Sequence, residues 1–481
     1  MAYDTVFNVE KKNSYFTDSV LKKLQKIVPN GVSTGETDRI IYSKDYMPIS
    51  LRWFIDGKLP SLADCIIWPE TTNQVARVLS LASSKKIPVI PYGDGSGVLG
   101  AAIPVHGGII IDCKKMDKIL DIDDQGLMVT AETGVNGMIL ERKLNQNGYT
   151  LGHIPQSLYC SSLGGWIACK AAGQFSTKYG KIEDMLIALE AVLPDGTIIS
   201  SKAVPRSSTG PAVERLFLGS EGRFGIVTKA TLKIWPYPEK KVLSSFVFDN
   251  IQQSLDAVRK IMRNNIFPAV VRIYDKNETL RHFYEFAEAK DKIMLVLLME
   301  GNRQLVSLEE KISTEICEKN NGVFCGEKPV KRWLKTRFSV RESSDFTPRG
   351  FIFDTVEISV SWKDAKKMYE EMIRAMRSVK GVVVASAHAS HFYPQGVCFY
   401  FTFGGVSPKK IDPFEFYKSM WDVMMKTCIA HQGSISHHHG IGILRSKWLT
   451  EEMGNRFDML SSIKDALDPH HIMNPGKMGD E

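Results

Sequence analysis

The stretch that decides the fold is PYGDGSGVLG, residues 91–100, in which a short strand is expected to run directly into closely spaced glycines. Such glycines let several backbone N–H groups converge on one point, which suits a pyrophosphate. The stretch is not a Walker loop, because no Gly-Lys-Ser/Thr follows it. It also lacks the dinucleotide-binding fingerprint, because no helix of the required kind opens at the third glycine. Taken alone, the segment could equally be a simple turn.

Two further glycine-rich segments follow it in the chain. PQSLYCSSLGGW, residues 155–166, combines small hydroxyl residues with a glycine pair, so its backbone can lie flat against a planar or phosphorylated ligand. GSEGRFGIVT, residues 219–228, carries glycines into a strand. Each of these segments is also compatible with a tight loop between packed elements.

The sequence around these loops predicts short strands that alternate with helices. An amphipathic helix opened by a threonine cap is expected over 71–86, and a helix closed by Gly148 over 135–148. Strands are expected at residues 65–69, 87–92, 107–112, 127–134, 197–200 and 224–236.

A candidate domain boundary lies at YPEKK, residues 237–241. Beyond it, strands are expected at 244–248, 269–274, 293–301 and 397–403, with helices over 251–264, 305–319 and 364–379, which favours an α+β layer with antiparallel strands. We therefore predict an N-terminal lead-in (1–60), a first domain (61–238), a second domain (239–432) and a C-terminal segment that returns to the first domain (433–481).

Composition excludes several classes of protein. Hydrophobic residues make up 43% and charged residues 24% of 481 residues, close to a globular average. No apolar run could span a membrane, and no secretory signal starts the chain, so a cytoplasmic location is expected. The eight scattered cysteines include no C-x-x-C pair, which argues against metal ribbons and disulfide frameworks. A net charge of +7 without a basic tract does not favour nucleic-acid binding.

In this order, the three glycine-rich segments resemble the FAD-binding domain of the vanillyl-alcohol oxidase or p-cresol methylhydroxylase (PCMH) family of FAD-linked oxidases. The closing LDPHHIMNPGKM, residues 467–478, is similar to that family too, so the resemblance covers roughly residues 60–478. It implies a two-subdomain FAD-binding PCMH-type domain, followed by an α+β substrate or cap domain with an antiparallel sheet.

The resemblance also implies a set of cofactor-binding residues. No histidine or cysteine lies between Pro91 and Gly100, so we expect FAD to be held non-covalently. Asp94 departs from the family's loop, and its carboxylate would repel a pyrophosphate unless it points away or caps backbone N–H groups. The implied FAD contacts are Pro91, Tyr92, Gly93, Asp94, Gly95, Ser96, Gly97, Pro155, Ser157, Ser161, Ser162, Gly164, Gly165, Glu221, Gly222, Gly225 and Ile226.

Three adjacent histidines stand in GSISHHHGIG, residues 433–442. Imidazole is a common metal ligand, but adjacent residues of an extended chain point to alternating faces and cannot easily share one ion. A surface cluster without a role is a second interpretation. General acid–base chemistry beside a flavin is the interpretation we prefer, because imidazole titrates near neutral pH.

Within the family, 2-hydroxy-acid dehydrogenases carry Glu-His-Gly at this place, and His438 replaces that glutamate. The triple histidine followed by Gly-Ile-Gly and LRSKWL resembles the alkyldihydroxyacetonephosphate synthases, as do PAVVRIYD (268–275), PRSSTGP (205–211) and GVCFYF (396–401). That resemblance implies Tyr400 as the active-site phenol, His437, His438 and His439 as imidazoles facing the substrate, and Arg341 as the substrate-anchoring cation.

Two functions remain open from the sequence. The first is a synthase-like exchange of an acyl for an alkyl chain on a keto-phosphate, without net redox, as in ether-lipid synthesis. The second is hydride transfer from a D-2-hydroxy acid or other secondary alcohol to FAD, with a quinone or electron-transfer protein as acceptor. No metal is assigned; His388 and His391 are expected to be buried or substrate-facing. A homodimer is expected, and peripheral membrane contact stays open.

Overall fold

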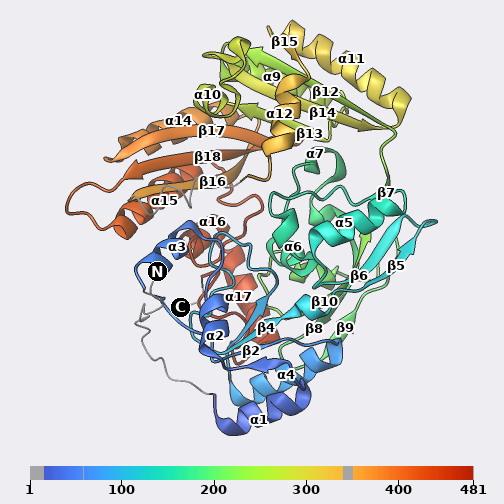
Figure 1. The fold of residues 1–481 in the computed structure, drawn as a ribbon, viewed down its shortest axis with the longest axis vertical. Helices are drawn as coiled ribbons and strands as arrows, with labels where there is room; N and C mark the ends of the chain where they lie inside the picture. The colour runs from blue at the N-terminus through green and yellow to red at the C-terminus, as the bar shows by residue number, and fades with distance from the viewer. Residues whose placement is uncertain (1–15, 58, 340–349, 480–481) are drawn as a thin grey trace.

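The computed structural model describes residues 16–57, 59–339 and 350–479. Figure 1 shows a cap of strands and helices at the top and a larger part below, into which the C-terminal helices return. The helices of the lower part are α1 Asp18–Ile27, α2 Glu36–Tyr42, α3 Pro48–Ile55, α4 Thr72–Lys85, α5 Gly137–Gln146, α6 Leu163–Cys169, α7 Ser176–Tyr179, α8 Ile182–Met185, α16 Ser446–Met453 and α17 Arg456–Leu467.

The lower part contains two main sheets, as a two-subdomain FAD-binding domain requires. The first has the order β1-β2-β4-β3 with β2, β4 and β3 parallel; its strands are β1 Val32–Ser33, β2 Cys65–Ile67, β4 Ile109–Asp112 and β3 Val89–Tyr92. The second is antiparallel, with the order β5 Ile119–Asp123, β6 Met128–Glu132, β10 Ile226–Lys233, β8 Leu186–Val192 and β9 Ile198–Ser200. The short strands β7 Tyr149–Thr150 and β11 Trp235–Pro236 pair separately.

Local signals in the sequence set several of these boundaries. The Thr71 side chain accepts a hydrogen bond from the N–H of Gln74 and caps α4, as predicted. Gly148 follows α5 with φ of +81°, a conformation that glycine adopts without strain. The predicted boundary near residue 238 falls between β11 and β12.

The cap consists of one antiparallel sheet covered by helices. Its strand order is β15 Val323–Gly326, β12 Lys240–Phe248, β14 Ile293–Gly301, β13 Val270–Tyr274, β17 Val382–Phe392, β18 Gly396–Val406 and β16 Phe351–Ser361. Its helices are α9 Ile251–Arg263, α10 Lys276–Phe283, α11 Arg303–Lys319, α12 Lys328–Thr336, α14 Ala365–Ser378 and α15 Pro413–Ala430. The antiparallel cap sheet was predicted, but its strands β15, β16 and β17 were not.

Alternation along β18 separates a packed face from a polar face. Val397, Phe399, Phe401 and Phe403 are buried in the core that contains α14 and α15. Tyr400 therefore points to the opposite face, because successive side chains of a strand alternate. That face meets the lower part of the molecule.

The C-terminal segment crosses back to the lower part (Figure 1). Met473 forms an isolated bridge with Val89, at the start of the first glycine-rich loop. The Asn474 amide donates to the carbonyls of Ala101 (3.0 Å) and Glu221 (2.7 Å), so one side chain joins two of the glycine-rich segments. None of the described helices is both long and apolar enough to cross a lipid bilayer.

Candidate functional site

A row of four residues crosses the polar face of the cap sheet. Tyr274 pairs with His388, His388 with Tyr400, and Tyr400 with Glu357 as direct neighbours on β13, β17, β18 and β16. The rings of His388 and Tyr400 stack with centroids 4.6 Å apart. Strand register therefore brings residues more than a hundred positions apart in sequence into one line.

An irregularity in β17 adds His391 to this row. The pairing of β17 with β18 shifts between Ser390 and Phe392, and His391 has φ of +55°. A bulge of this kind re-aims a side chain that regular alternation would place elsewhere. The His391 ring bonds the Tyr400 hydroxyl through Nε2 (2.8 Å) and the Ser176 hydroxyl through Nδ1 (2.5 Å).

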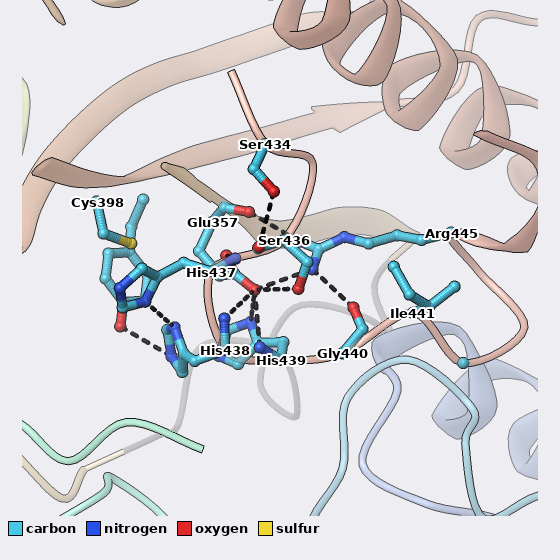
Figure 2. Close-up of polar contacts among 12 residues, drawn as sticks. Glu357, Cys398, Ser434, Ser436, His437, His438, His439, Gly440, Ile441 and Arg445 are labelled. Atoms are coloured by element: carbon cyan, nitrogen blue, oxygen red, sulfur yellow. Dashed lines mark hydrogen bonds and ion pairs between the residues drawn. The ribbon is translucent and has the colours of Figure 1, made fainter. Parts of the chain in front are cut away.

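Glu357 holds the histidine loop against the sheet (Figure 2). Its carboxylate accepts hydrogen bonds from the backbone N–H groups of His437 (2.6 Å) and His439 (2.9 Å) and from the Arg445 guanidinium (2.9 Å). Burial by itself would raise the pKa of Glu357, but Arg445 and His439 bring it down to about 2. The loop is thus built around a charged, fully buried carboxylate.

The ring contacts form one continuous hydrogen-bonded chain. Tyr393 OH contacts His437 Nε2 (2.7 Å), and His437 Nδ1 contacts His438 Nδ1 (3.0 Å). His438 Nε2 contacts Tyr400 OH (3.1 Å), which continues to His391. Such a chain can pass a proton from one end to the other, with Tyr400 at its centre.

Burial keeps the imidazoles of this chain uncharged at neutral pH. Desolvation lowers the pKa of His437 to about 3 and holds those of His438 and His391 well below the usual value. Burial also raises the pKa of Tyr400 well above its usual value, so the phenol keeps its proton. The arrangement is a neutral phenol between two neutral bases.

His439 occupies a different position from His438. Its Nδ1 lies 3.5 Å from Glu357 Oε1, at ion-pair distance but outside hydrogen-bond geometry, and its side chain is 26% exposed. Burial lowers its pKa to about 4. Its ring centroid is 6.1 Å from that of Tyr400, so His439 lies beside the hydrogen-bonded chain of rings but is not a member of it.

Cys398 also lies beside the histidine loop. Its sulfur and one ring nitrogen from each of His437 and His438 lie within 4.8 Å of one another, a spacing that could hold a metal ion. Adjacent histidines therefore do converge here, contrary to the alternation argument from sequence. Because both Nε2 atoms already bond to phenols, the absence of a bound metal stays our prediction.

The first two glycine-rich segments lie directly against each other. A Cβ added to Gly93 would stand 2.2 Å from the Ser162 hydroxyl, which would then have to turn away. Within the described residues, no hydrogen bond uses the backbone N–H groups of residues 93–98, which are all partly exposed. The loop therefore offers free, clustered donors, as a pyrophosphate requires.

The side chains around this first loop leave its N–H groups open. The Asp94 carboxylate accepts from the Asn136 amide (3.4 Å), which turns it toward α5. Ser162 caps α6 through the N–H of Gly165 (3.4 Å), and Ser161 accepts from the Trp166 indole (2.8 Å). Lys114, which donates to the Gly93 carbonyl (3.3 Å), places a cation beside the loop that the sequence motifs did not indicate.

The third glycine-rich segment joins the loops to the histidines. The Glu221 carboxylate accepts from the N–H groups of Ile441 (2.5 Å) and Gly442 (2.9 Å). Gly222 packs on Pro91, and Ile226 is buried in the core of the first sheet. Through its side chain, Glu221 therefore binds the end of the histidine loop.

Two families of known proteins match successive parts of the chain. Residues 63–202 match the FAD binding domain family, and residues 237–478 match the family described as FAD linked oxidases, C-terminal domain. The chain belongs to the family of FAD-linked oxidases. FAD is its cofactor, and it is an FAD-dependent enzyme.

Relatives of this FAD-linked oxidase carry the names of different activities. It is 31% identical to alkyldihydroxyacetonephosphate synthase of Caenorhabditis elegans over 453 residues, 87% of this chain and 76% of the relative. It is 31% identical to the FAD-linked oxidoreductase YgcU of Escherichia coli (strain K12), with 84% and 87% covered. It is 26% identical to glycolate oxidase subunit GlcD of Bacillus subtilis, with 94% of each covered.

Solved structures confirm the predicted architecture. An alkyldihydroxyacetonephosphate synthase structure superposes with a TM-score of 0.83 and 25% identity, covering 97% of this chain and 87% of the other. A p-cresol methylhydroxylase structure superposes with a TM-score of 0.77 and 18% identity, covering 96% and 97%. The PCMH-type fold of this FAD-linked oxidase was therefore predicted correctly.

The structure brings most, but not all, of the predicted site together. Tyr400, His437 and His438 share one hydrogen-bonded chain, whereas Arg341 lies outside the described residues. Sequence reasoning assigned no role to Glu357 or to Arg445, and it left His391 without an assigned contact. Only a strand assignment for 382–392 with its bulge would have placed His391 beside Tyr400.

A different arginine occupies the site of this FAD-linked oxidase. Arg272 is buried, its Nε donates to the Tyr274 hydroxyl (2.8 Å), and its guanidinium lies over the Tyr274 and Trp333 rings. Among the described residues it forms no ion pair with a carboxylate. Arg272 is two positions before Tyr274 on β13, so it lies on the same face of the sheet. Its charge contributes to the lowered pKa of His388 and of His391.

Proposed function

We propose that this FAD-linked oxidase replaces the acyl chain of an acyl keto-phosphate with the alkyl chain of a long-chain alcohol, without net redox. The observation that carries the proposal is the Tyr400 hydroxyl, held between the neutral imidazoles of His391 and His438. A phenol in this position can exchange protons with either neighbour. The similarity to alkyldihydroxyacetonephosphate synthases supports the same reaction.

FAD would lie along the first two glycine-rich loops, with its pyrophosphate on the N–H groups of residues 93–98. No histidine or cysteine lies in this loop, so the cofactor would be held without a covalent bond. When bound, FAD supplies the ring nitrogen to which the substrate carbon can attach. Glu221 to Ile226 would support the cofactor indirectly, by fixing the first loop and the histidine loop.

The protein's own residues would bind the phosphate and move protons. Arg272 can supply a fork of donors to a phosphate, and Arg341 stays a second predicted anchor. His438 would take a substrate proton through Tyr400, and the chain to His437 would share it. His439 would face the substrate from the border of the site.

A cavity suits the chain of the alcohol. It measures about 780 Å³ and lies between α5 and β7 of the lower part and β12, β14 and α12 of the cap. Its apolar wall includes Leu158, Phe175, Leu298, Leu334 and Phe338. Phe175 of the cavity wall immediately precedes Ser176, which bonds His391.

A second candidate function is hydride transfer from a D-2-hydroxy acid to FAD, with a separate electron acceptor. His439 favours it, because a partly exposed imidazole beside the Glu357 carboxylate suits removal of a hydroxyl proton. The similarity to glycolate oxidase subunit GlcD and to a D-lactate dehydrogenase of Danio rerio points the same way.

One anaerobic experiment separates the two functions. The FAD-loaded protein is mixed with acyl-dihydroxyacetone phosphate, and separately with a panel of D-2-hydroxy acids. We expect the keto-phosphate to bleach the flavin absorbance and a long-chain alcohol to restore it. Prompt bleaching by a hydroxy acid, without any response to the keto-phosphate, would exclude the synthase reaction.

A further inference from the structure

A buried carboxylate on α10 lies against His388, outside the chain centred on Tyr400. The Glu278 side chain is fully buried and accepts hydrogen bonds from the Ser386 hydroxyl (2.6 Å) and the Arg281 guanidinium (2.8 Å). Its Oε2 lies 3.5 Å from His388 Nδ1. Within the described residues, His388 Nδ1 has no hydrogen bond at that distance, so a small movement completes the pair.

The surroundings of His388 leave one edge of its ring available. Tyr274 and Tyr400 stack on the imidazole, with centroids 5.6 and 4.6 Å away. Nδ1 faces Glu278, whereas Nε2 bonds to no described residue and the side chain is 13% exposed. The tyrosine rings therefore cover the faces of the imidazole, whereas its Nε2 edge is left without a partner among the described residues. This edge lies on the side of the sheet that carries Tyr400.

The charge of Glu278 decides which nitrogen of His388 carries the proton. Burial would raise the pKa of Glu278, but His282, His388 and Arg281 hold it well below its usual value. A charged carboxylate beside Nδ1 favours a proton there, which leaves the lone pair on Nε2. Burial, followed by the charge of Arg272, lowers the pKa of His388 to about 4, so the ring is a neutral base.

We propose that Glu278 and His388 form a second acid–base pair of this site, which accepts the proton of the incoming alcohol. The proposal rests on the proposed exchange reaction. Over the whole exchange, the bond from the substrate carbon to the acyloxy oxygen breaks, a carboxylate is released, and the alcohol oxygen forms a new bond to that carbon. The alcohol O–H bond breaks and its proton moves to Nε2 and from there to the released carboxylate. The proton that was removed from the substrate carbon returns to it, so no electrons are gained or lost overall.

A separate base is needed because the Tyr400 hydroxyl already has two partners, His391 and His438. Removal of a proton from the substrate carbon and removal of one from the alcohol are distinct steps at distinct atoms. Two neutral bases on one face of the sheet, His438 reached through Tyr400 and His388 beside it, can serve the two steps.

The test follows the two phases of flavin absorbance in H388Q and E278Q. Acyl-dihydroxyacetone phosphate should bleach both variants at close to the wild-type rate. Recovery on addition of hexadecanol should slow about 100-fold in H388Q and about 10-fold in E278Q, within the range of general-base effects. H282Q is the matched control, because His282 contacts the same Glu278 oxygen (3.3 Å) but is not part of the proposed pair, and we expect recovery within about twofold of wild type.

Other outcomes overturn the proposal. Recovery at the wild-type rate in both variants, or equal slowing of both phases, would show that His388 is not the base for the alcohol. If H388Q fails to bind FAD, the recovery rate of E278Q tests the proposal, because glutamine keeps the size of the Glu278 side chain. A wild-type protein that the keto-phosphate does not bleach would refute the proposed function itself, a result distinct from a selective loss of recovery.

Discussion

Tyr400 gains its proposed role from its neighbours. A phenol in water is a weak acid, and burial makes this one weaker still. Its hydroxyl nevertheless lies within hydrogen-bond distance of two imidazoles that burial keeps neutral, His391 and His438. The phenol can therefore give a proton to one ring as it receives one from the other.

We expect Y400F to lose this exchange. Turnover should fall by about 100-fold or more, because the hydroxyl joins the two halves of the chain. FAD absorbance should be retained, since the described contacts of the hydroxyl are only with histidines. Y369F is the control: its hydroxyl donates to Asp275 (3.3 Å), away from the histidine loop. Turnover of Y400F within a few-fold of wild type would exclude Tyr400 as a proton carrier.

At the scale of elements, the third glycine-rich segment holds the histidine loop and the C-terminal segment together. Glu221 has φ of +50° and directs its carboxylate at the N–H groups that end the histidine loop. Its own carbonyl accepts from Asn474 of the C-terminal segment. Three stretches distant in sequence therefore meet at one residue.

Replacing this carboxylate should loosen the loop. E221Q keeps one acceptor oxygen but presents an amide N–H₂ to backbone donors, which costs about 1–3 kcal/mol for the buried group left unpaired. We expect a lower unfolding temperature and turnover reduced about tenfold. Both are compared with E318Q on the exposed side of α11, which should behave as wild type. An unchanged E221Q would mean that the loop does not depend on this contact.

At the scale of the molecule, buried neutral histidines should make the fold sensitive to acid. Burial lowers the pKa of His153 and His437 to about 3, and of His388 and His439 to about 4. In the unfolded chain these groups take up protons near pH 6.5. Their contribution to stability is therefore full above that pH and is lost progressively toward pH 3–4.

The unfolding temperature should thus fall as the pH drops below about 6.5. H153Q removes one such group away from the proposed chemistry. The slope of its unfolding free energy against pH should be smaller than in the wild type by about one bound proton. H470Q, at an exposed position, should leave the slope unchanged. A flat stability profile between pH 7 and 5 would show that these histidines are already protonated in the fold.

Peripheral membrane contact stays a prediction, and we place it on β15 and α12 of the cap. Val323 and Phe324 of β15 are 62% and 53% exposed, and the neighbouring α12 carries the exposed cations Lys328, Lys331 and Lys335. Phe324 also lines the cavity proposed for the alcohol chain. Apolar side chains beside cations favour binding to anionic lipid surfaces.

We expect the protein to sediment with vesicles that contain anionic phospholipid and to remain free with neutral ones. A K328E/K331E/K335E variant should lose this binding and keep its FAD absorbance. Reversing Lys290, Lys311 and Lys319 together provides a control of equal charge change elsewhere on the cap. Equal loss in both variants would indicate attraction by net charge without a defined surface.

Local patterns determined many strands and helices, and their resemblance to a known family indicated the cofactor and the fold class. Ordered glycine-rich turns, a threonine cap and period-two strands act over a few residues, so they are visible in sequence. Tyr400 and the histidine triplet were predicted as site residues because a family motif carried them. Strands β16 and β17 were missed, because their mixed residues take their pattern from a sheet whose partners lie far along the chain.

Only tertiary structure brought Glu357, Arg445 and His391 to the site. Strand register puts Glu357 opposite Tyr400, and a single bulge turns His391 toward it. The neutral state of the histidines likewise comes from burial, which cannot be read from the sequence. The three glycine-rich segments, short and locally encoded, indicated an FAD protein through their resemblance to a known family. The proton chain depends on the packing of the cap sheet against the histidine loop, because long-range pairing creates contacts that no local segment contains.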